Sequence, residues 1–211
     1  MNEQLWLSVV AENRAIAVIR AWSYQKGYHM AEAVIRGGMH MVEIAWNSDR
    51  APELIQNLRS TYPNCVIGAG TLFACEDVHG AIASGAQFLF SPHFEERMLR
   101  EATKHQVPMI PGALTPSEIV KAWQGGASSV KVFPAASLGG ADYIARLQEV
   151  LPEVPLIPTG GVTVENAGDF LDAGAIAVGL SGSLFPQQVL EAEHWESIAQ
   201  RSEALVSSIT Q

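Results

Sequence analysis

The sequence has almost no cysteine: Cys65 and Cys75 are the only two in 211 residues. They form no Cys-x-x-Cys pair and have no nearby histidine at a zinc-ligand spacing, so no metal centre is predicted. Cys65 lies inside an apolar run, which favours a buried small hydrophobe over a reactive thiol. A reducing, cytoplasmic setting is therefore the expectation, and no cofactor is predicted.

Positive charge is also scarce, since 13 Lys and Arg stand against 22 Asp and Glu, giving a formal net charge of -9. This balance disfavours nonspecific binding to nucleic acid or to an anionic membrane. No segment approaches the roughly 18 uninterrupted apolar residues of a membrane span. Residues 1–12 lack the basic start and apolar stretch of a secretory signal. An anionic small-molecule substrate would need local groups to hold it.

No low-complexity linker divides the chain, so residues 1–211 are predicted to form a single domain. Short apolar, β-branched runs recur along it, each followed by turn residues and a helix-like stretch. Strict alternation of strands and helices requires parallel pairing, and eight such units close into a (β/α)8 TIM barrel of the α/β class. The eight expected strands are Ala15–Ile19, Met41–Ala45, Cys65–Ala69, Phe88–Phe90, Pro108–Ile110, Ser128–Val132, Pro155–Ile157 and Ala175–Val178.

Two helices are expected at the ends of this barrel. Gln4–Asn13 would be a short N-terminal helix that plugs the end opposite the active site, and Gln187–Gln211 would be the last outer helix. A doubly wound open sheet is the structural alternative. The eight units, and the lack of a Gly-x-Gly-x-x-Gly stretch after the first strand, make it the second choice.

Lys131 is the only one of four lysines that falls within an expected strand, between Val130 and Val132. Removing an ammonium ion from water is costly, so an interior site favours the neutral amine. A neutral amine can attack a ketone, and the resulting iminium withdraws electrons from a neighbouring carbon–carbon bond. The competing interpretation is a structural lysine paired with a buried carboxylate, but interior lysines are uncommon enough to favour function.

Glu43 is likewise a charged residue inside an expected strand, the second one, where it lies between Val42 and Ile44. A partly desolvated carboxyl has a raised pKa and can exchange protons near neutral pH. The competing interpretation is that Glu43 is simply the ion-pair partner of Lys131. The two roles are compatible, because a close pair tunes each other's titration.

Glycine-rich segments follow the last two expected strands, where barrels of this kind bind phosphate. Thr159-Gly160-Gly161 and Gly179 to Gly182 would let backbone N–H groups approach an anion, and the hydroxyl of Ser181 or Ser183 would add a donor. Arg20 closes the first strand and is the nearest strong cation for a carboxylate or phosphate. A structural, exposed arginine is an equally good interpretation of Arg20.

These motifs together resemble the family of 2-keto-3-deoxy-6-phosphogluconate aldolases and 4-hydroxy-2-oxoglutarate aldolases. The similarity runs over almost the whole chain, and the Lys-x-Phe-Pro-Ala stretch with Gly-Ala-Gly-Thr upstream is its most specific part. Its carriers are Val42-Glu43-Ile44, Gly68-Ala69-Gly70-Thr71, Ser91-Pro92, Ile110-Pro111-Gly112, Val130-Lys131-Val132-Phe133-Pro134-Ala135 and Thr159-Gly160-Gly161-Val162.

The resemblance implies a class I aldolase that cleaves a 2-keto-4-hydroxy acid to pyruvate and an aldehyde, without a metal and usually as a homotrimer. It implies Lys131 as the Schiff-base lysine and Glu43 as the general acid/base. It also implies a substrate-binding set, in which Thr71, Pro92 and Phe133 line the pyruvyl pocket and Gly160, Gly161 and Ser181 face the distal phosphate.

Two positions depart from the phosphogluconate-type pattern. Asn47 stands where an arginine usually follows the glutamate by four residues, and His93 replaces the small residue that commonly follows Ser-Pro. The segment from Glu43 to Ser48 is closer to the branch acting on the 6-phosphogalactonate epimer, which also has an arginine near Arg20. The substrate is therefore open among the phosphogluconate, the phosphogalactonate and hydroxyoxoglutarate.

Two rival functions stay open at this point. One is a phosphate-binding barrel of another chemistry, such as an epimerase or a thiamine-phosphate-synthase-like transferase, although the metal ligands of an epimerase are missing from the strand exits. The other is a noncatalytic sensor that binds phosphorylated sugar acids. The presence of both Lys131 and Glu43 argues against the sensor.

Overall fold

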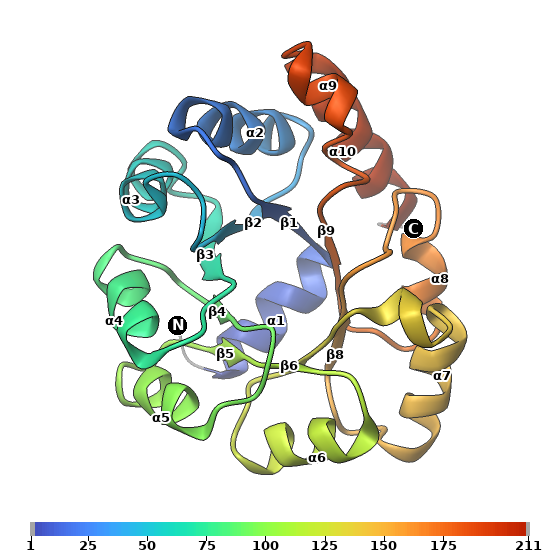
Figure 1. Cartoon of the computed structure of the whole chain (residues 1–211). Coiled ribbons are helices and arrows are strands. Elements are labelled where there is room, and N and C mark those ends of the chain that lie inside the picture. The colour runs from blue at the N-terminus through green and yellow to red at the C-terminus, as the bar shows by residue number, and fades with distance from the viewer. Residues whose placement is uncertain (1–2, 210–211) are drawn as a thin grey trace.

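The computed structural model describes residues 3–209 and consists of short parallel strands surrounded by helices (Figure 1). A six-stranded parallel sheet, curved as a half-barrel, has the order β5-β4-β3-β2-β1-β9, and a three-stranded parallel sheet has the order β6-β7-β8. The strands are β1 (Ala15–Ile19), β2 (Met41–Ala45), β3 (Val66–Gly70), β4 (Leu89–Phe90), β5 (Met109–Ile110), β6 (Gly112–Ala113), β7 (Val130–Val132), β8 (Leu156–Pro158) and β9 (Val178–Leu180).

The predicted closed, eight-stranded TIM barrel is wrong, because the strand hydrogen bonds divide into two separate sheets. One break falls at Pro111, between β5 and β6, where proline has no N–H to donate to a ladder. At the other break, β8 and β9 are linked only by an isolated bridge between Thr159 and Gly179. The α/β class and the parallel pairing of the strands are as predicted.

Most of the expected strands occur within a residue or two of their predicted positions, and β1 and β2 match in full. The sequence did not predict β6, because Pro111-Gly112 resembles a turn. β9 was predicted as Ala175–Val178 but forms at Val178–Leu180. Gly179 was interpreted as part of a turn, whereas it lies within the strand opposite Thr159.

Helices α2 to α8 and α10 lie outside the strands, and α1 lies behind them in the view of Figure 1. The predicted helix Gln187–Gln211 is divided into α9 and α10, because Glu193 adopts a left-handed backbone with φ 52° between them. Its last two residues fall outside the described residues. The helices are α1 (Glu3–Asn13), α2 (Tyr24–Arg36), α3 (Ala51–Thr61), α4 (Cys75–Ala83), α5 (Glu96–Lys104), α6 (Pro116–Gln124), α7 (Ala141–Val150), α8 (Ala167–Asp172), α9 (Gln187–Glu191) and α10 (Trp195–Ile209), with a 3-10 turn at Ala135–Leu138.

Apolar side chains form two clusters, one on each side of the strands. The larger cluster fills the space between the strands and the outer helices. The smaller one lies inside and includes Trp6 and Val10 of α1, so this helix closes the inner core as predicted. The indole N–H of Trp6 donates to Ser129 Oγ at 3.1 Å, which satisfies the one polar atom of that ring.

Both core clusters leave the carboxyl ends of the strands free to carry polar side chains. Among residues 3–209, none of the helices combines the length and the apolar character that a membrane crossing needs.

Candidate active site

The amine of Lys131 lies at the centre of the candidate site. Lys131 is the middle residue of β7, with Gly112 of β6 and Ile157 of β8 as its register partners, and only 6% of it is exposed. Its Nζ lies 5.3 Å from the ring centroids of both Phe90 and Phe133. These neighbours keep most water away from the amine, as the interior position in the sequence predicted.

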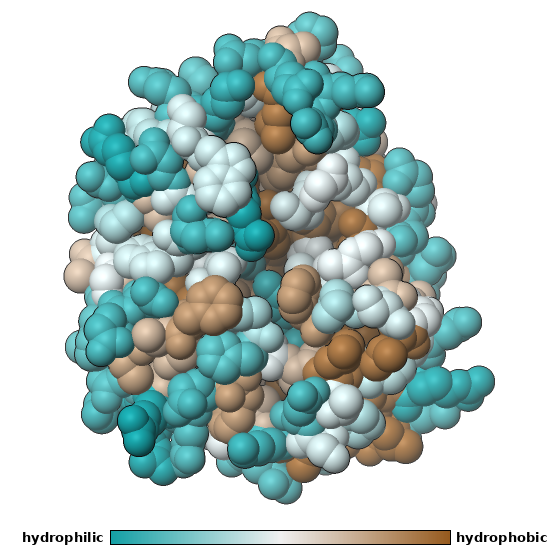
Figure 2. Space-filling model, viewed as in Figure 1, coloured by the Kyte–Doolittle hydropathy of each residue, from teal (hydrophilic) through white to brown (hydrophobic). Residues whose placement is uncertain are grey.

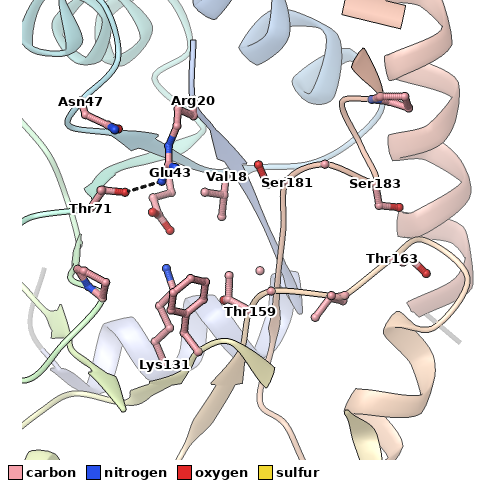
Figure 3. A pocket seen from close by; sticks show the side chains of 18 of the residues that line it. Val18, Arg20, Glu43, Asn47, Thr71, Lys131, Thr159, Thr163, Ser181 and Ser183 are labelled. Atoms are coloured by element: carbon pink, nitrogen blue, oxygen red, sulfur yellow. Dashed lines mark hydrogen bonds between the residues drawn. The ribbon is translucent and has the colours of Figure 1, made fainter. Parts of the chain in front are cut away.

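Glu43 projects from β2 toward Lys131, so that the carboxyl and the amine face each other across the pocket (Figure 3). The residue is 1% exposed, and its Oε1 atom is buried without a hydrogen-bond partner in the described structure. Burial raises the pKa of this carboxyl above its usual range, and the nearby positive charges of Lys131 and Arg20 offset part of that rise. The raised pKa that the sequence predicted for Glu43 is confirmed in direction.

The missing side chain of Gly70 makes room for the Glu43 carboxyl. Gly70 ends β3 and is the register partner of Ala45, on the strand that carries Glu43. A Cβ atom at Gly70 would overlap Oε1 and Cδ of Glu43. This close approach explains why glycine is needed at the second glycine of the Gly-Ala-Gly-Thr stretch.

Thr71, the last residue of the same stretch, adopts a left-handed backbone with φ 61°. Such a conformation is an outlier for a β-branched residue and is characteristic of functional sites. Its hydroxyl accepts a hydrogen bond from Arg20 Nη2 at 3.2 Å, drawn as a dashed line in Figure 3. The pair brings a fixed positive charge to the pocket on the Glu43 side.

The far end of the pocket is formed by the segments after β8 and β9. Gly160 and Gly161 line the pocket with φ values of 86° and 88°, a backbone conformation that favours glycine. Ser183 Oγ accepts from the backbone N–H of Val164 at 3.0 Å. The guanidinium of Arg201, on α10, donates to the Ser183 carbonyl at 3.2 Å and lines the same pocket.

One pocket of about 830 Å³ contains all ten residues that were predicted to be catalytic or substrate-binding. It opens on the face of the molecule shown in Figure 2. His93 is not among the lining residues, and its ring stacks on Phe73 at 5.9 Å beside the pocket. The sequence-predicted lining residues are Arg20, Glu43, Asn47, Thr71, Pro92, Lys131, Phe133, Gly160, Gly161 and Ser181.

Sequence reasoning missed several residues of this pocket, above all Arg201. Arg201 lies on the last helix, far in the sequence from any strand exit, so no local pattern marks it. Phe73 and Thr163 lie in the loops that follow strand exits, and this position was the signal that could have marked them. Glu165 was also missed, although it lies four residues after the Gly-Gly pair.

Comparisons with known proteins point to one family over nearly the whole chain. The family model described as "Aldolase: KDPG and KHG aldolase" matches residues 7–201. The chain is 34% identical over 158 residues to the 2-dehydro-3-deoxy-phosphogluconate aldolase of Treponema pallidum (strain Nichols), covering 75% of each protein. It is 32% identical over 172 residues to the 2-dehydro-3-deoxy-6-phosphogalactonate aldolase of Escherichia coli (strain K12), covering 81% of this chain and 83% of that one.

A solved structure agrees with these sequence matches. The KDPG aldolase of Legionella pneumophila, crystallised with pyruvate captured at low pH as a covalent carbinolamine intermediate, superposes with a TM-score of 0.86 at 30% identity. The match covers 94% of this chain and 97% of that chain. With the family model spanning the strands that carry Lys131 and Glu43, the chain belongs to the KDPG and KHG aldolase family.

Proposed function

We propose that this protein is a class I aldolase that cleaves a 2-keto-4-hydroxy acid to pyruvate and an aldehyde through a Schiff base on Lys131. The observation that carries the proposal is a nearly buried primary amine facing a buried carboxyl inside one pocket. Family membership and the pyruvate-bound Legionella structure support the same lyase reaction.

The reaction begins when the Lys131 amine adds to the C2 ketone, giving a carbinolamine that loses water to form an iminium ion. Glu43, directly or through a water molecule, removes the proton of the C4 hydroxyl. The C3–C4 bond then breaks, its electron pair flows into the iminium, and the aldehyde leaves. The remaining enamine takes a proton at C3 from Glu43, and water hydrolyses the new iminium to release pyruvate and the free lysine.

The raised pKa of Glu43 suits both halves of this cycle. A carboxyl that ionises closer to neutral pH than usual can accept the hydroxyl proton and return it to carbon. Desolvation is the main cause of that raised pKa, so the same burial that excludes water from the iminium also tunes the acid/base group. Gly70 permits this arrangement, because any larger residue would displace the carboxyl.

The two ends of the pocket fit the two ends of a phosphorylated keto acid. Thr71, Pro92 and Phe133 would surround the pyruvyl half near Lys131, with Arg20 holding an anionic group. Gly160, Gly161 and Ser181 would bind the distal phosphate, by the family resemblance. Arg201 adds a positive charge at the same end of the pocket, which favours a substrate carrying an anion there.

Asn47 bears on which epimer of the substrate the protein cleaves. It lines the pocket on the Glu43 side, and both phosphogluconate- and phosphogalactonate-type aldolases are among the relatives. We infer that 2-keto-3-deoxy-6-phosphogluconate, its galactonate epimer or 4-hydroxy-2-oxoglutarate is the physiological substrate. Comparing kcat/KM for the three, with pyruvate measured by coupling to lactate dehydrogenase, identifies it.

Trapping with pyruvate and borohydride tests the proposed Schiff base. Reduction of the iminium should leave a covalent adduct on Lys131, located by peptide mass analysis. Lys131→Arg should form no adduct and show no turnover, because a guanidinium does not deprotonate. Lys121→Arg, at a lysine on the outer helix α6, is the matched control and should retain both adduct formation and turnover. Full activity in Lys131→Arg, or tight ligand binding without pyruvate release in the unmodified chain, would overturn the proposal.

A further inference from the structure

A second group of chemically versatile side chains lies outside the pocket, where α4 and α5 pack side by side (Figure 1). His79 of α4, Glu101 of α5 and His105 at the end of α5 each offer one ligand atom. These three atoms all lie within 4.8 Å of one another. We propose that they form a surface site for one divalent transition-metal ion, with zinc as the best fit.

The distances suit such an ion with little rearrangement. His79 Nε2 already lies 3.2 Å from Glu101 Oε2, a separation compatible with two ligands of one ion. Zinc binds imidazole nitrogen and carboxylate oxygen at about 2.0–2.2 Å. His79 and His105 have exposed side chains that can close on the ion, and solvent can supply the fourth ligand.

The backbone beneath the three ligands is anchored by the core. Val78, next to His79, and Ala102, next to Glu101, are both fully buried. Glu101 and His105 are four residues apart, so they share one face of the helix end. Ligands carried by packed helices lose less conformational freedom on binding than ligands carried by loops.

The charges around the site also fit a cation, with one exception. His105 follows the carboxyl end of α5, where the helix dipole favours positive charge. Glu101 supplies the one carboxylate of the group, and its Oε2 faces His79 Nε2. Lys104 is the exception: its Nζ lies 2.6 Å from Glu101 Oε1 and competes with the ion for that carboxylate.

The ligand types select the class of ion. Two imidazoles and one carboxylate suit zinc and neighbouring transition metals, whereas magnesium and calcium prefer oxygen ligands alone. The ligands lie on outer helices and none of them lines the Lys131 pocket, so the ion would link α4 to α5 and take no part in catalysis.

Zinc titration of untagged, metal-free protein by calorimetry tests this site. We expect one saturable site, together with a rise in Tm on zinc addition because the ion binds the folded chain. His79→Ala and His105→Ala should each weaken binding by at least about tenfold, since losing even an outer-sphere partner has that effect. Lys104→Gln should strengthen binding.

His29→Ala is the matched control, because His29 also lies beside a carboxylate, with its Nδ1 3.5 Å from Glu32, but belongs to no group of three ligands in the described chain. This variant should bind zinc like the parent protein. Unchanged zinc affinity in both His79→Ala and His105→Ala would overturn the proposal, as would a loss of binding in His29→Ala alone. Cobalt gives an independent measurement, because a site with these ligands should yield visible absorption bands that disappear in His79→Ala.

Discussion

Burying Glu43 costs free energy that the fold recovers elsewhere. The carboxyl lies fully inside the pocket, and one of its oxygens has no hydrogen-bond partner in the described structure. An unpaired buried polar atom destabilises a protein by about 1–3 kcal/mol. An apolar side chain would fill the same space with a smaller loss of folding free energy. The presence of Glu43 is therefore explained by its chemistry more readily than by stability.

Replacing Glu43 by glutamine should therefore separate stability from activity. Glu43→Gln should abolish turnover, because an amide cannot exchange the C4 hydroxyl proton. It should also raise the free energy of unfolding at pH 7 by about 0.5–2 kcal/mol, since the ionisable group no longer has to be desolvated. Denaturant unfolding and pyruvate release, measured on the same samples, check both parts.

The increase in the free energy of unfolding that Glu43→Gln causes should depend on pH, because the pKa of Glu43 is raised. Below the ordinary pKa of 4.5, the carboxyl is protonated in the folded and unfolded chains alike, so Glu43→Gln should add little stability there. As the pH rises above 4.5, only the unfolded chain ionises at first, which destabilises the parent protein relative to the variant. Glu153→Gln, at an exposed glutamate, is the control and should show no such trend. An equal gain at pH 4 and pH 7 would contradict the argument.

Arg201 allows the two ends of the substrate to be tested separately. Arg201→Gln should lower kcat/KM for a phosphorylated substrate by about 10- to 100-fold, the effect of losing a charged hydrogen bond. The yield of the pyruvate adduct should not change, because pyruvate lacks the distal anion. Arg146→Gln, which removes an exposed arginine paired with Glu149 on α7, should change neither quantity. A loss of adduct in Arg201→Gln would place the residue in the lysine chemistry instead.

Helix α1 contributes to the inner core chiefly through the packing of Trp6. Trp6 is fully buried against Phe88 and Phe90, with ring centroids 5.2 and 6.3 Å away. Trp6→Ala should lower the free energy of unfolding by about 3–5 kcal/mol, because a large cavity remains and Ser129 loses its partner. Trp22→Ala, at an exposed tryptophan, should change it by less than about 0.5 kcal/mol. Thermal unfolding distinguishes the two, and equal losses would show that α1 does not close the inner core.

The elements that the sequence predicted well are those whose residues carry a strong local signal. β1 is a five-residue apolar run, and β2 is apolar except for Glu43; both are buried along their whole length, and each was placed correctly. The failures occur where glycine or proline lies inside a strand, as in β6 and β9, because both residues also mark turns. The division of the strands into two sheets could not be predicted from the sequence either, because it depends on hydrogen bonds between segments far apart in the chain.

The candidate site shows the same contrast. Lys131 and Glu43 were found because a charged residue inside an apolar strand is conspicuous, and the pocket contains both. Arg201 was missed because an arginine on an amphipathic helix is ordinary, and only the packing of α10 brings it to the pocket. The roles of the ten predicted residues stay predictions until the variants are measured.

At the scale of the whole molecule, the two proposed sites are separate in position and in chemistry. The lysine site opens at the carboxyl ends of the strands, and the metal site lies outside, on α4 and α5. Homotrimeric assembly, which the family resemblance implies, and a cytoplasmic location, expected from the low cysteine content, stay predictions. A trimer would show a sedimentation mass three times that of the chain.

Chelation should distinguish the two sites in a single preparation. EDTA should leave pyruvate formation unchanged, because the proposed nucleophile and the proposed acid/base group are side chains of the protein itself. The same chelator should return the Tm of zinc-loaded protein to its metal-free value, because the ion linking α4 to α5 is removed. His79→Ala should lose the zinc-dependent change in Tm while keeping full aldol cleavage. A loss of activity in EDTA would instead favour metal-assisted chemistry, as in the epimerases that share phosphate-binding α/β folds, and would displace Lys131 from the centre of the mechanism.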